Sequence, residues 1–479
     1  MLDSLLDLWR WFLALPHPGV YLAAAWGAYL LGLGGWIVLQ KRPPVATLSW
    51  LFGLAAIPVL GVVIYIVFGP QRIKRHRLRR ARSRVSLSRE QVEAAGEAEL
   101  ATLAHATSGL PASTCTDVRL LVDGAATYAA LLEAIAGARS HVHLEYYIYA
   151  ADTTGTALRD ALVERARAGV AVRLLLDAVG SAGIPRGFFA PLLAAGGELA
   201  WFHPLQLGRI WQRTWINLRS HRKIVVVDGR VGFTGGINIT DEQNERVRAD
   251  AFRDLHVRVE GDAVRGLQVL FVEDWAYATG QRDFISSVVR AMPPRRPGPI
   301  AAQVLGSGPD SPWEAIHRLN VGAIHAASRR VWLATPYFVP GEAALMALTS
   351  AAMGGLDVRV LVPRNSDSRL VTWAARSYFD ELMAAGVRVY EYGPRMLHTK
   401  ALLVDDDLAI LGSANFDSRS FSLNFEVSMV FRDAVVAGEL EQLLVGELAH
   451  APRVRADRPT PLWSVRLPEA LARLLSPVL

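Results

Sequence analysis

The chain has 479 residues, 51% of them hydrophobic, and it carries 51 Lys and Arg against 45 Asp and Glu. A net charge of +6 would suit a nucleic-acid partner, but residues 1–84 alone carry +9, which leaves the remainder net acidic at −3. This distribution argues against nucleic-acid binding by the body of the chain. The single cysteine, Cys115, excludes an internal disulfide and a cysteine-rich metal site.

Two uncharged segments come first in chain order, residues 20–39 and 45–68. Each is long enough to cross a bilayer, which takes about 20 apolar residues in a helix. Only five residues, 40–44, connect them. We therefore predict a membrane anchor over residues 1–70 that consists of a transmembrane helical hairpin. A pair of buried core helices is the alternative, although core helices rarely run so long without a charge.

A basic segment follows the second predicted span. Residues 71–84 hold eight Lys or Arg and no acid. Basic flanks stay on the cytoplasmic side of a membrane, so we expect the rest of the chain to be cytoplasmic. Such a cluster also attracts anionic lipid head groups, unless it is only a solvated linker that fixes the topology. Residues 85–116 are rich in Glu and Ala and are expected to continue, largely as helix, to the body, so that 71–116 form one linker.

The body contains an internal repeat. Residues 134–149 resemble 323–338, each a helix that leads into a strand, and residues 169–177 resemble 355–363, each a short buried strand after a helix. This alternation of helix and strand predicts α/β layers. A proline-rich stretch at 293–299 separates the halves. We expect two tandem domains, 117–292 and 300–479.

A pair of motifs at equivalent places in the two halves carries the strongest signal. In each, His, Lys, Asp, a small residue and Asn recur with identical spacing. The first set is His221, Lys223, Asp228, Gly236 and Asn238, and the second is His398, Lys400, Asp405, Ser413 and Asn415. One such match could arise by chance, whereas two at corresponding positions of a repeat form a specific pattern.

The residue types in this pattern suit a phosphoryl group. The apolar run after each Lys predicts a buried strand, and side chains two residues apart in a strand share a face, so His and Lys emerge together. Glycine or serine lets the backbone approach a ligand closely. Two ammonium groups and fixed amide donors stabilise phosphoryl oxygens. A metal site is a less suitable interpretation, because the Lys at the centre of each motif is not a metal ligand. A single His would more often be a core residue, but here the His recurs within a duplicated pattern.

The paired motifs resemble those of the phospholipase D superfamily, and the similarity to bacterial cardiolipin synthases with two membrane spans covers nearly the whole chain. Further matching segments are residues 41–44, 144–148, 335–340, 412–421 and 423–426. Gly236 stands where many relatives have Ser. The resemblance implies two phospholipase D-like α/β domains with mixed sheets flanked by helices, related by a pseudo-twofold axis with both motifs at their interface.

The resemblance also implies an activity. One His would attack the phosphorus of a phosphatidylglycerol and form a phosphatidyl-histidine, and the other would act as acid and then as base, giving cardiolipin and glycerol without a cofactor or metal. By analogy, His221 is the nucleophile and His398 the acid and base, although the near symmetry of the motifs leaves the order open. The ring of each histidine needs an orienting partner. Asp254 and Glu426, which follow their histidines by 33 and 28 residues, are expected to serve, unless they are solvated strand ends.

Other functions remain open at this point. A phospholipase D that hydrolyses phosphatidyl esters, or a phosphatidylserine synthase, would use the same residues, and a nuclease or a non-catalytic membrane scaffold fits less well. The expected location is a bacterial inner membrane, with a multi-pass anchor and phosphatidylglycerol or other anionic phospholipids as partners. Trp211 and Trp215 with interleaved Arg209 and Arg213 suit either a membrane-facing rim or core packing. Residues 468–479 suit a short amphipathic helix; the sequence predicts neither its role nor the oligomeric state.

Overall fold

The computed structural model describes residues 7, 11, 14, 16–39, 44–57, 61, 65, 99–203, 218–281, 283–311 and 313–476. The chain divides into two compact units. One lies within residues 1–71, and the other, the body, holds residues 99–203 and 218–476. The predicted basic segment 71–84, residues 85–98 of the expected linker, and Arg209, Arg213, Trp211 and Trp215 lie outside the described residues.

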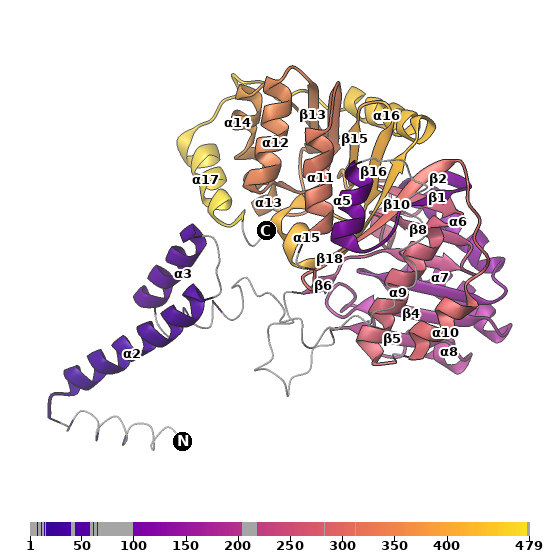
Figure 1. Ribbon diagram of the computed structural model, residues 1–479, viewed down its shortest axis with the longest axis horizontal. Coiled ribbons are helices and arrows are strands. Elements are labelled where there is room, and N and C mark those ends of the chain that lie inside the picture. The colour runs from indigo at the N-terminus through magenta and orange to yellow at the C-terminus, as the bar shows by residue number, and fades with distance from the viewer. Residues whose placement is uncertain are drawn as a thin grey trace. The chain divides into compact units, whose positions relative to one another are not determined.

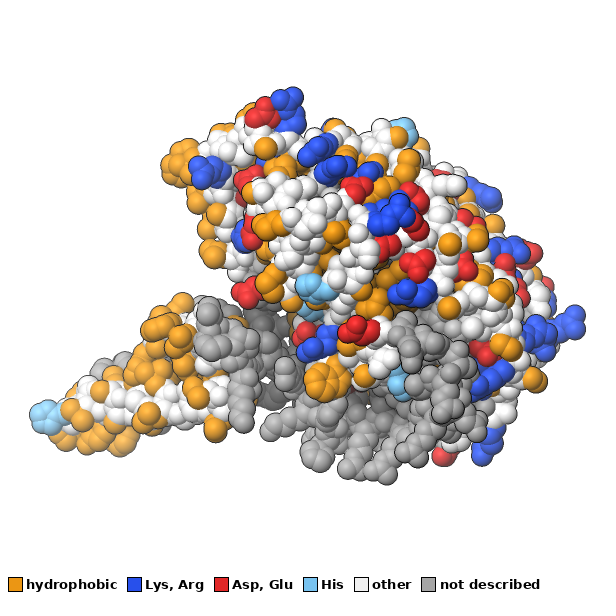
Figure 2. All heavy atoms as spheres, turned by 45° about the horizontal axis from the view of Figure 1, so that its top comes forward, with side chains coloured by type: hydrophobic (Ala, Val, Ile, Leu, Met, Phe, Trp, Pro, Cys, Tyr) orange, Lys and Arg blue, Asp and Glu red, His pale blue; other side chains and the backbone are white. Residues whose placement is uncertain are grey.

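The N-terminal unit contains helices α2 (Pro18–Val38) and α3 (Pro44–Ala56). Of the described residues, α2 is the one helix long and apolar enough to cross a membrane, so the helix predicted at 20–39 is confirmed. Figure 2 shows hydrophobic side chains along α2 at the left, and Leu31 is 80% exposed. The 13 residues of α3 span about 20 Å, less than a bilayer core. Most of the rest of the predicted span 45–68 lies outside the described residues.

The first half of the body is built on a seven-stranded mixed sheet with the order β2-β9-β8-β7-β3-β4-β5 (Figure 1). The strands are β2 (Asp117–Val122), β3 (His141–Tyr146), β4 (Ala171–Asp177), β5 (Glu198–Phe202), β7 (Ile224–Val227), β8 (Val231–Gly235) and β9 (Leu255–Glu260). Its helices are α6 (Asp123–Ala136), α7 (Thr153–Arg167), α8 (Ala190–Ala194), α9 (Ala263–Thr279) and α10 (Asp283–Ala291).

The second half is built on a nine-stranded sheet with the order β1-β10-β18-β16-β15-β11-β13-β14, to which β6 adds by pairing with β18. The strands are β1 (Ser113–Cys115), β6 (Arg219–Ser220), β10 (Ile300–Ser307), β11 (Arg330–Ala334), β13 (Asp357–Pro363), β14 (Arg388–Tyr392), β15 (Ala401–Val404), β16 (Leu408–Gly412) and β18 (Asn424–Arg432). The helices are α5 (Glu99–Ser108), α11 (Ala315–His325), α12 (Glu342–Met353), α13 (Arg369–Arg376), α14 (Phe379–Ala384), α15 (Ser418–Ser422), α16 (Ala434–Ala449) and α17 (Leu467–Leu474). A small separate ladder joins β12 (Phe338–Val339) to β17 (Phe416–Asp417).

The expected α/β fold is confirmed, and the two sheets repeat one strand order. β2, β9, β8, β7, β3, β4 and β5 correspond to β10, β18, β16, β15, β11, β13 and β14, with the same parallel and antiparallel pairings. The described part of the expected linker is helical only in its first section. Residues 99–108 form a helix, but Ser113–Cys115 pair with β10 and so belong to the second sheet, which corrects the predicted linker.

The middle core lies between the sheets and receives inward side chains from both motif strands, β7 and β15. It contains α9 and α16 together with inward side chains of both sheets. In β7, Ile224 and Val226 enter this core, whereas Val225 and Val227 pack against α6 and α7 on the outer side. In β15, Leu403 enters it and Leu402 packs outward. This alternation on strands buried on both faces fixes their register, and so it fixes where each motif histidine emerges.

Candidate active site

His221 is held by a carboxylate from the second half of the repeat. Its backbone N–H, just before β7, donates to the carbonyl of Phe425 in β18 at 2.9 Å. Its ring Nδ1 lies 3.0 Å from both carboxylate oxygens of Glu426. Burial lowers the pKa of His221 to about 4, and the Glu426 charge opposes this shift. The ring is therefore neutral at pH 7, and a proton on Nδ1 that is donated to Glu426 leaves Nε2 with its lone pair.

His398 is held in the same manner by the first half. Its Nδ1 lies 2.6 Å from Oδ2 of Asp254, the residue just before β9. The backbone N–H of His398 donates to the carbonyl of Arg253 at 2.7 Å. Burial and the charge of Lys400 lower the pKa of His398. Asp254 and Glu426 thus both contact a motif histidine, but each contacts the one in the other half; the association of each carboxylate with the histidine that precedes it in sequence was wrong.

The two motif lysines bring positive charge close to both histidines. Nζ of Lys223 donates to the carbonyl of His221 at 2.8 Å, and Nζ of Lys400 donates to the carbonyl of His398. Both lysines are buried. Burial lowers the pKa of Lys223 to about 7 and that of Lys400 to about 8, and the charges of Glu426 and Asp254 oppose both shifts. Besides burial, the pKa of each histidine is lowered by the lysine of its own motif and, to a smaller extent, by the lysine of the other motif: by Lys223 and Lys400 at His221, and by Lys400 and Lys223 at His398.

The small residue of each motif faces the carboxylate of its own half. Oγ of Ser413 donates to Oε2 of Glu426 at 2.5 Å and accepts the backbone N–H of Val427 at 3.0 Å. In the first half a hydroxyl has no room, since a Cβ added to Gly236 would lie 2.1 Å from Oδ1 of Asp254. The expected placement of these residues near the site therefore holds, but their contacts differ between the halves.

Gln243 supplies the missing donor in the first half. It ends a short 3₁₀ turn, Asp241–Gln243, and its Nε2 lies 3.3 Å from Oδ2 of Asp254 and 3.1 Å from Nδ1 of His398. Its Oε1 accepts the backbone N–H of Asn238 at 2.5 Å. The sequence reading missed Gln243. A signal was present, because Gln243 follows Asn238 by five residues just as Ser420, which accepts the backbone N–H of Asn415 at 3.2 Å, follows Asn415.

The motif aspartates lie elsewhere. Asp228 and Asp405 follow the far ends of β7 and β15, with left-handed φ angles of 54° and 50°. The carboxylate of Asp228 accepts the backbone N–H groups of residues 139–141, and that of Asp405 accepts those of residues 328–330. Burial acts to raise the pKa of Asp228, but these three amides outweigh it and the pKa lies below its usual value. The structure does not bring either aspartate to the histidines.

Aromatic side chains surround the two histidines. The ring centroid of Tyr147 lies 5.0 Å from that of His221, and the rings of Phe252 and Tyr337 lie 5.7 and 6.4 Å from that of His398. The hydroxyl of Tyr337 donates to Asp367 at 2.7 Å. Such walls exclude water and strengthen electrostatic contacts inside the site.

A buried guanidinium holds the backbone of Glu426. Arg222, between His221 and Lys223, is 0% exposed and pairs with the equally buried Asp274 of α9. Its Nε donates to the carbonyl of Glu426 at 3.1 Å, and its Nη2 donates to that of Ser307 at 3.2 Å. Because an arginine stays charged, this pair is stable only while both partners are present.

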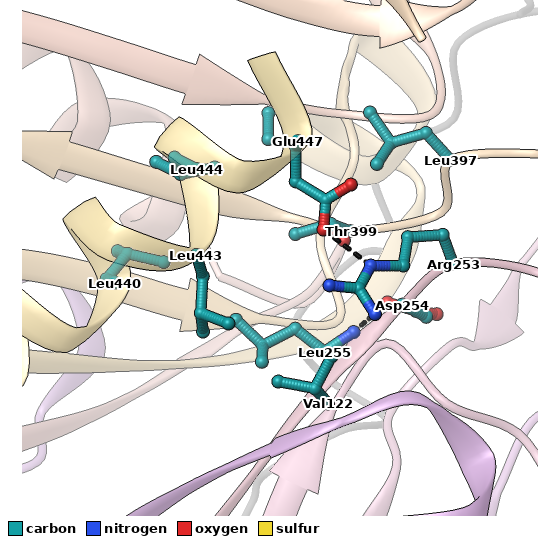
Figure 3. A pocket seen from close by; sticks show the side chains of 11 residues that line it. Val122, Arg253, Asp254, Leu255, Leu397, Thr399, Leu440, Leu443, Leu444 and Glu447 are labelled. Carbon is teal, nitrogen blue, oxygen red and sulfur yellow. Dashed lines mark hydrogen bonds and ion pairs between the residues drawn. The ribbon is translucent and has the colours of Figure 1, made fainter. Parts of the chain in front are cut away.

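A second ion network supports Asp254, beside the small pocket of Figure 3. Arg253 pairs with Asp123 at 2.8 Å and with Glu447 of α16 at 2.5 Å. Arg395 pairs with the same oxygen of Asp123 at 2.7 Å. The other oxygen of Asp123 accepts the backbone N–H of Asp254 at 3.1 Å. In Figure 3, Leu440, Leu443 and Leu444 line the opposite wall. The network joins both halves of the body next to one orienting carboxylate.

Within the described part of the chain, no three His, Cys, Asp or Glu side chains converge as they would around a metal ion. The site instead brings together two imidazoles and two lysine amino groups, with one carboxylate at each imidazole. An imidazole can form and break a bond to phosphorus, and charged lysines can balance the charge on its oxygens.

Comparison with known proteins gives one consistent family. The family described as "Cardiolipin synthase, PLD-like domain" matches residues 131–274 and 321–445. A cardiolipin synthase of Halalkalibacterium halodurans is 37% identical over 98% of this chain and 98% of its own length. One of Alkalihalophilus pseudofirmus is 39% identical over 92% of this chain and 91% of its own. The crystal structure of a phosphatidylserine synthase from Haemophilus influenzae Rd KW20 covers 80% of this chain and 100% of that one, with a TM-score of 0.60 at 13% identity, so it shares the fold.

Proposed function

Because the chain belongs to the cardiolipin synthase family with its phospholipase D-like domains, we propose that it is a phosphatidyltransferase that converts two phosphatidylglycerol molecules into cardiolipin and glycerol. The observation that carries this proposal is the convergence of two buried imidazoles, each hydrogen-bonded through Nδ1 to a carboxylate of the other half, with two lysines.

In the first step, Nε2 of His221 attacks the phosphorus of one phosphatidylglycerol, and the bond from phosphorus to the glycerol oxygen breaks. His398 gives the proton from its Nε2 to that oxygen, so glycerol leaves as a neutral alcohol. A neutral His221 suits the attack, since burial keeps its pKa at about 4. His398 must start protonated, and the negative charge of a bound phosphodiester favours this form.

In the second step, His398 accepts the proton of the glycerol hydroxyl on the second phosphatidylglycerol. That oxygen attacks the phosphorus, and the bond from phosphorus to Nε2 of His221 breaks. Lys223 and Lys400, with the amides of Asn238 and Asn415, are proposed to hold the non-bridging oxygens in both steps. Asp254 and Glu426 keep the rings oriented, and Gln243 assists at Asp254. Asp228 and Asp405 act on the fold, through the loops that they cap.

We further propose the anchor and the domain limits predicted above, apart from Ser113–Cys115, which pair with β10. Residues 1–70 form a two-helix membrane hairpin, the rest of 71–116 a basic segment and linker, and 117–292 and 300–479 the two domains, related by a pseudo-twofold axis. The repeated strand order and the apolar helix α2 support this arrangement. The basic residues after 71 support a cytoplasmic body at the inner membrane of a bacterium.

The test is incubation of the full-length protein, reconstituted into vesicles, with phosphatidylglycerol alone and no added metal. We expect cardiolipin and glycerol in equal amounts, and neither from His221→Ala of equal expression and insertion. Phosphatidic acid without cardiolipin would assign the chain to hydrolysis instead. Full activity of His221→Ala would remove the proposed nucleophile.

A further inference from the structure

The C-terminal segment of the body exposes an unusual amount of apolar surface. Thirteen large hydrophobic side chains are exposed among the described residues from 99 onward, and six of them lie within Leu462–Leu475. Trp463 is 79% and Leu474 is 75% exposed. The other seven lie elsewhere in the body, with no more than two on any one helix. We call the exposed side chains of this segment the C-terminal apolar face; its members are Leu462, Trp463, Leu467, Leu471, Leu474 and Leu475.

The opposite side of the same segment is firmly attached to the body. Ala472 is 1% exposed and belongs to the outer core of the second half. The Arg473 guanidinium donates to the carbonyl of Ser377 at 3.0 Å and lies 4.3 Å from the ring centroid of Tyr378. The hydroxyl of Tyr378 donates to Ser476 at 3.0 Å. The apolar face is therefore a fixed outward surface and not a loosely packed end.

The composition around this face fits an anionic bilayer. Residues 453–475 hold five Arg against one Asp and one Glu. Three of these Arg pair with carboxylates, Arg455 with Asp457, Arg458 with Asp380 and Glu469, and Arg473 with Glu381. The positive charge that complements anionic head groups therefore comes from Arg453 and Arg466. Tryptophan, leucine and arginine on one short helical segment are typical of helices that lie in the membrane interface. Isolated exposed apolar residues need no explanation, but a contiguous group of this size marks a contact surface. Figure 2 shows orange side chains at the left edge of the body, where Figure 1 places α17.

We propose that the C-terminal apolar face docks the second half of the body onto a membrane of anionic phospholipid. The proposal rests on the proposed function, because the substrate is then a lipid that must leave the bilayer for the site. The structure links the two places. α17 packs on α13, and α13 packs on β12, which follows directly after Tyr337, the aromatic neighbour of His398. Docking through α17 would therefore determine how far Tyr337 and His398 lie from the membrane surface.

The first experiment reads the contact without catalysis. The full-length protein carries an environment-sensitive fluorophore on Leu474→Cys, or on Leu193→Cys as the matched control, which is 51% exposed in the other half. Native Cys115 is 0% exposed and stays unlabelled. In phosphatidylglycerol vesicles, we expect a blue shift at position 474 and quenching by lipids with a shallow acyl-chain quencher at least about threefold stronger than at 193. Equal quenching would overturn the proposal. A blue shift without lipid quenching would assign the face to a protein contact and would overturn it too.

The second experiment reads the consequence. Trp463, Leu471 and Leu474 are replaced together by Gln, and Met346, Met353 and Val445, which are comparably exposed, are replaced together as the control. We expect the apparent KM for phosphatidylglycerol in vesicles to rise at least about threefold in the first variant only, with unchanged turnover in detergent mixed micelles, which also shows that it folds. An unchanged KM would overturn the proposal. If the proposed function fails, no variant makes cardiolipin, while the quenching result still stands.

Discussion

Nδ1 of His221 lies 3.0 Å from both carboxylate oxygens of Glu426, although the two residues are 205 positions apart in the chain. A carboxylate in this place fixes the tautomer of the ring and stabilises positive charge on it when a bond forms at Nε2. The reciprocal contact of Asp254 with His398 does the same for the other ring. The predictions below separate the roles of these four residues.

The order of the two histidines can be tested with a substrate whose leaving group needs no proton. With a phosphatidyl p-nitrophenol, His398→Ala should release about one equivalent of nitrophenol per site in a burst, because the nucleophile His221 is intact. His221→Ala should release none. The burst is followed by stopped-flow absorbance. A burst from His221→Ala and none from His398→Ala would reverse the order.

Loss of charge at either orienting carboxylate should slow turnover without unfolding the protein. Glu426→Gln and Asp254→Asn keep the shape but favour the wrong tautomer, and we expect kcat to fall by about 10²-fold or more in each. Asp457→Asn, at a carboxylate with 68% of its side chain exposed, is the control and should retain full kcat. Thermal unfolding of each variant shows whether the fold is kept.

The glycine and serine of the two motifs should respond differently to exchange. Gly236→Ser places a Cβ where Asp254 lies, 2.1 Å from Oδ1, so Asp254 must move away from His398, and we expect kcat to drop at least about tenfold. Ser413→Gly removes a hydrogen bond to Glu426 without a clash, at a cost of about 1 kcal/mol. Steady-state rates and melting temperatures of the two variants give the comparison. A larger effect from Ser413→Gly would contradict this interpretation.

Activity should have an alkaline limit to which both lysines contribute, together with His398, which must start protonated. Lys223 has a pKa lowered to about 7 and Lys400 one lowered to about 8, so below these values both are charged and above them they lose the charge that the phosphate oxygens need. We expect kcat/KM to fall as the pH rises from about 7 to about 9. On the acid side His221 remains neutral down to its pKa of about 4. A profile of kcat/KM that stays flat to pH 10 would show that neither lysine needs to be charged.

The same lysine shifts predict a change in stability. The unfolded chain holds the Lys223 proton up to its ordinary pKa of 10.5, whereas the folded chain releases it from about 7. The unfolded state thus binds more protons between these values, so this residue makes the free energy of unfolding rise with pH over that window. Lys223→Met should remove this rise, which denaturant titrations at pH 7 and 9 measure. An equal slope in Lys223→Met and the unsubstituted protein would refute the assignment.

Arg222 and Asp274 should depend on each other. Arg222→Met removes the positive charge that faces the buried carboxylate of Asp274, and we expect a loss of about 3–5 kcal/mol. Adding Asp274→Leu should restore much of the stability, because that buried carboxylate is then removed as well. It should not restore kcat, since the hydrogen bond from Arg222 to the carbonyl of Glu426 is still missing. Recovery of kcat together with stability would limit Arg222 to a structural role.

Much of the fold was predictable from two features of the sequence, the apolar runs of the strands and the internal repeat, because both can be recognised without knowing which residues meet in space. The apolar run after each motif lysine predicts β7 and β15, and the spacing of the repeat predicts two equivalent sheets. The partner of each histidine was not predictable in this way. Chain distance favours the carboxylate that follows in the same half, while the packing of β18 against β6 across the halves brings Glu426 to His221.

Gln243 escaped for a related reason. Its spacing from Asn238 matches that of Ser420 from Asn415, but Gln and Ser are different residue types, so the match is easily overlooked. The role of Gln243 also depends on the lack of space at Gly236, which only the backbone geometry reveals. The C-terminal amphipathic helix was predicted over 468–479; α17 runs from Leu467 to Leu474, and residues 477–479 lie outside the described residues. Which side of that helix faces outward follows from its packing on α13 and could not be read from eight residues.

The exchanged carboxylates have a consequence for how such a protein can arise and change. Either half alone carries a histidine without its partner, so a single copy could work only by pairing with another, at a rate limited by its concentration. Joining both copies in one chain makes that encounter intramolecular, so every molecule contains both halves and therefore both histidine–carboxylate pairs. It also allows the two copies to diverge. The first half has Gly236 and Gln243 where the second half has Ser413 and Ser420, which is a difference of this kind.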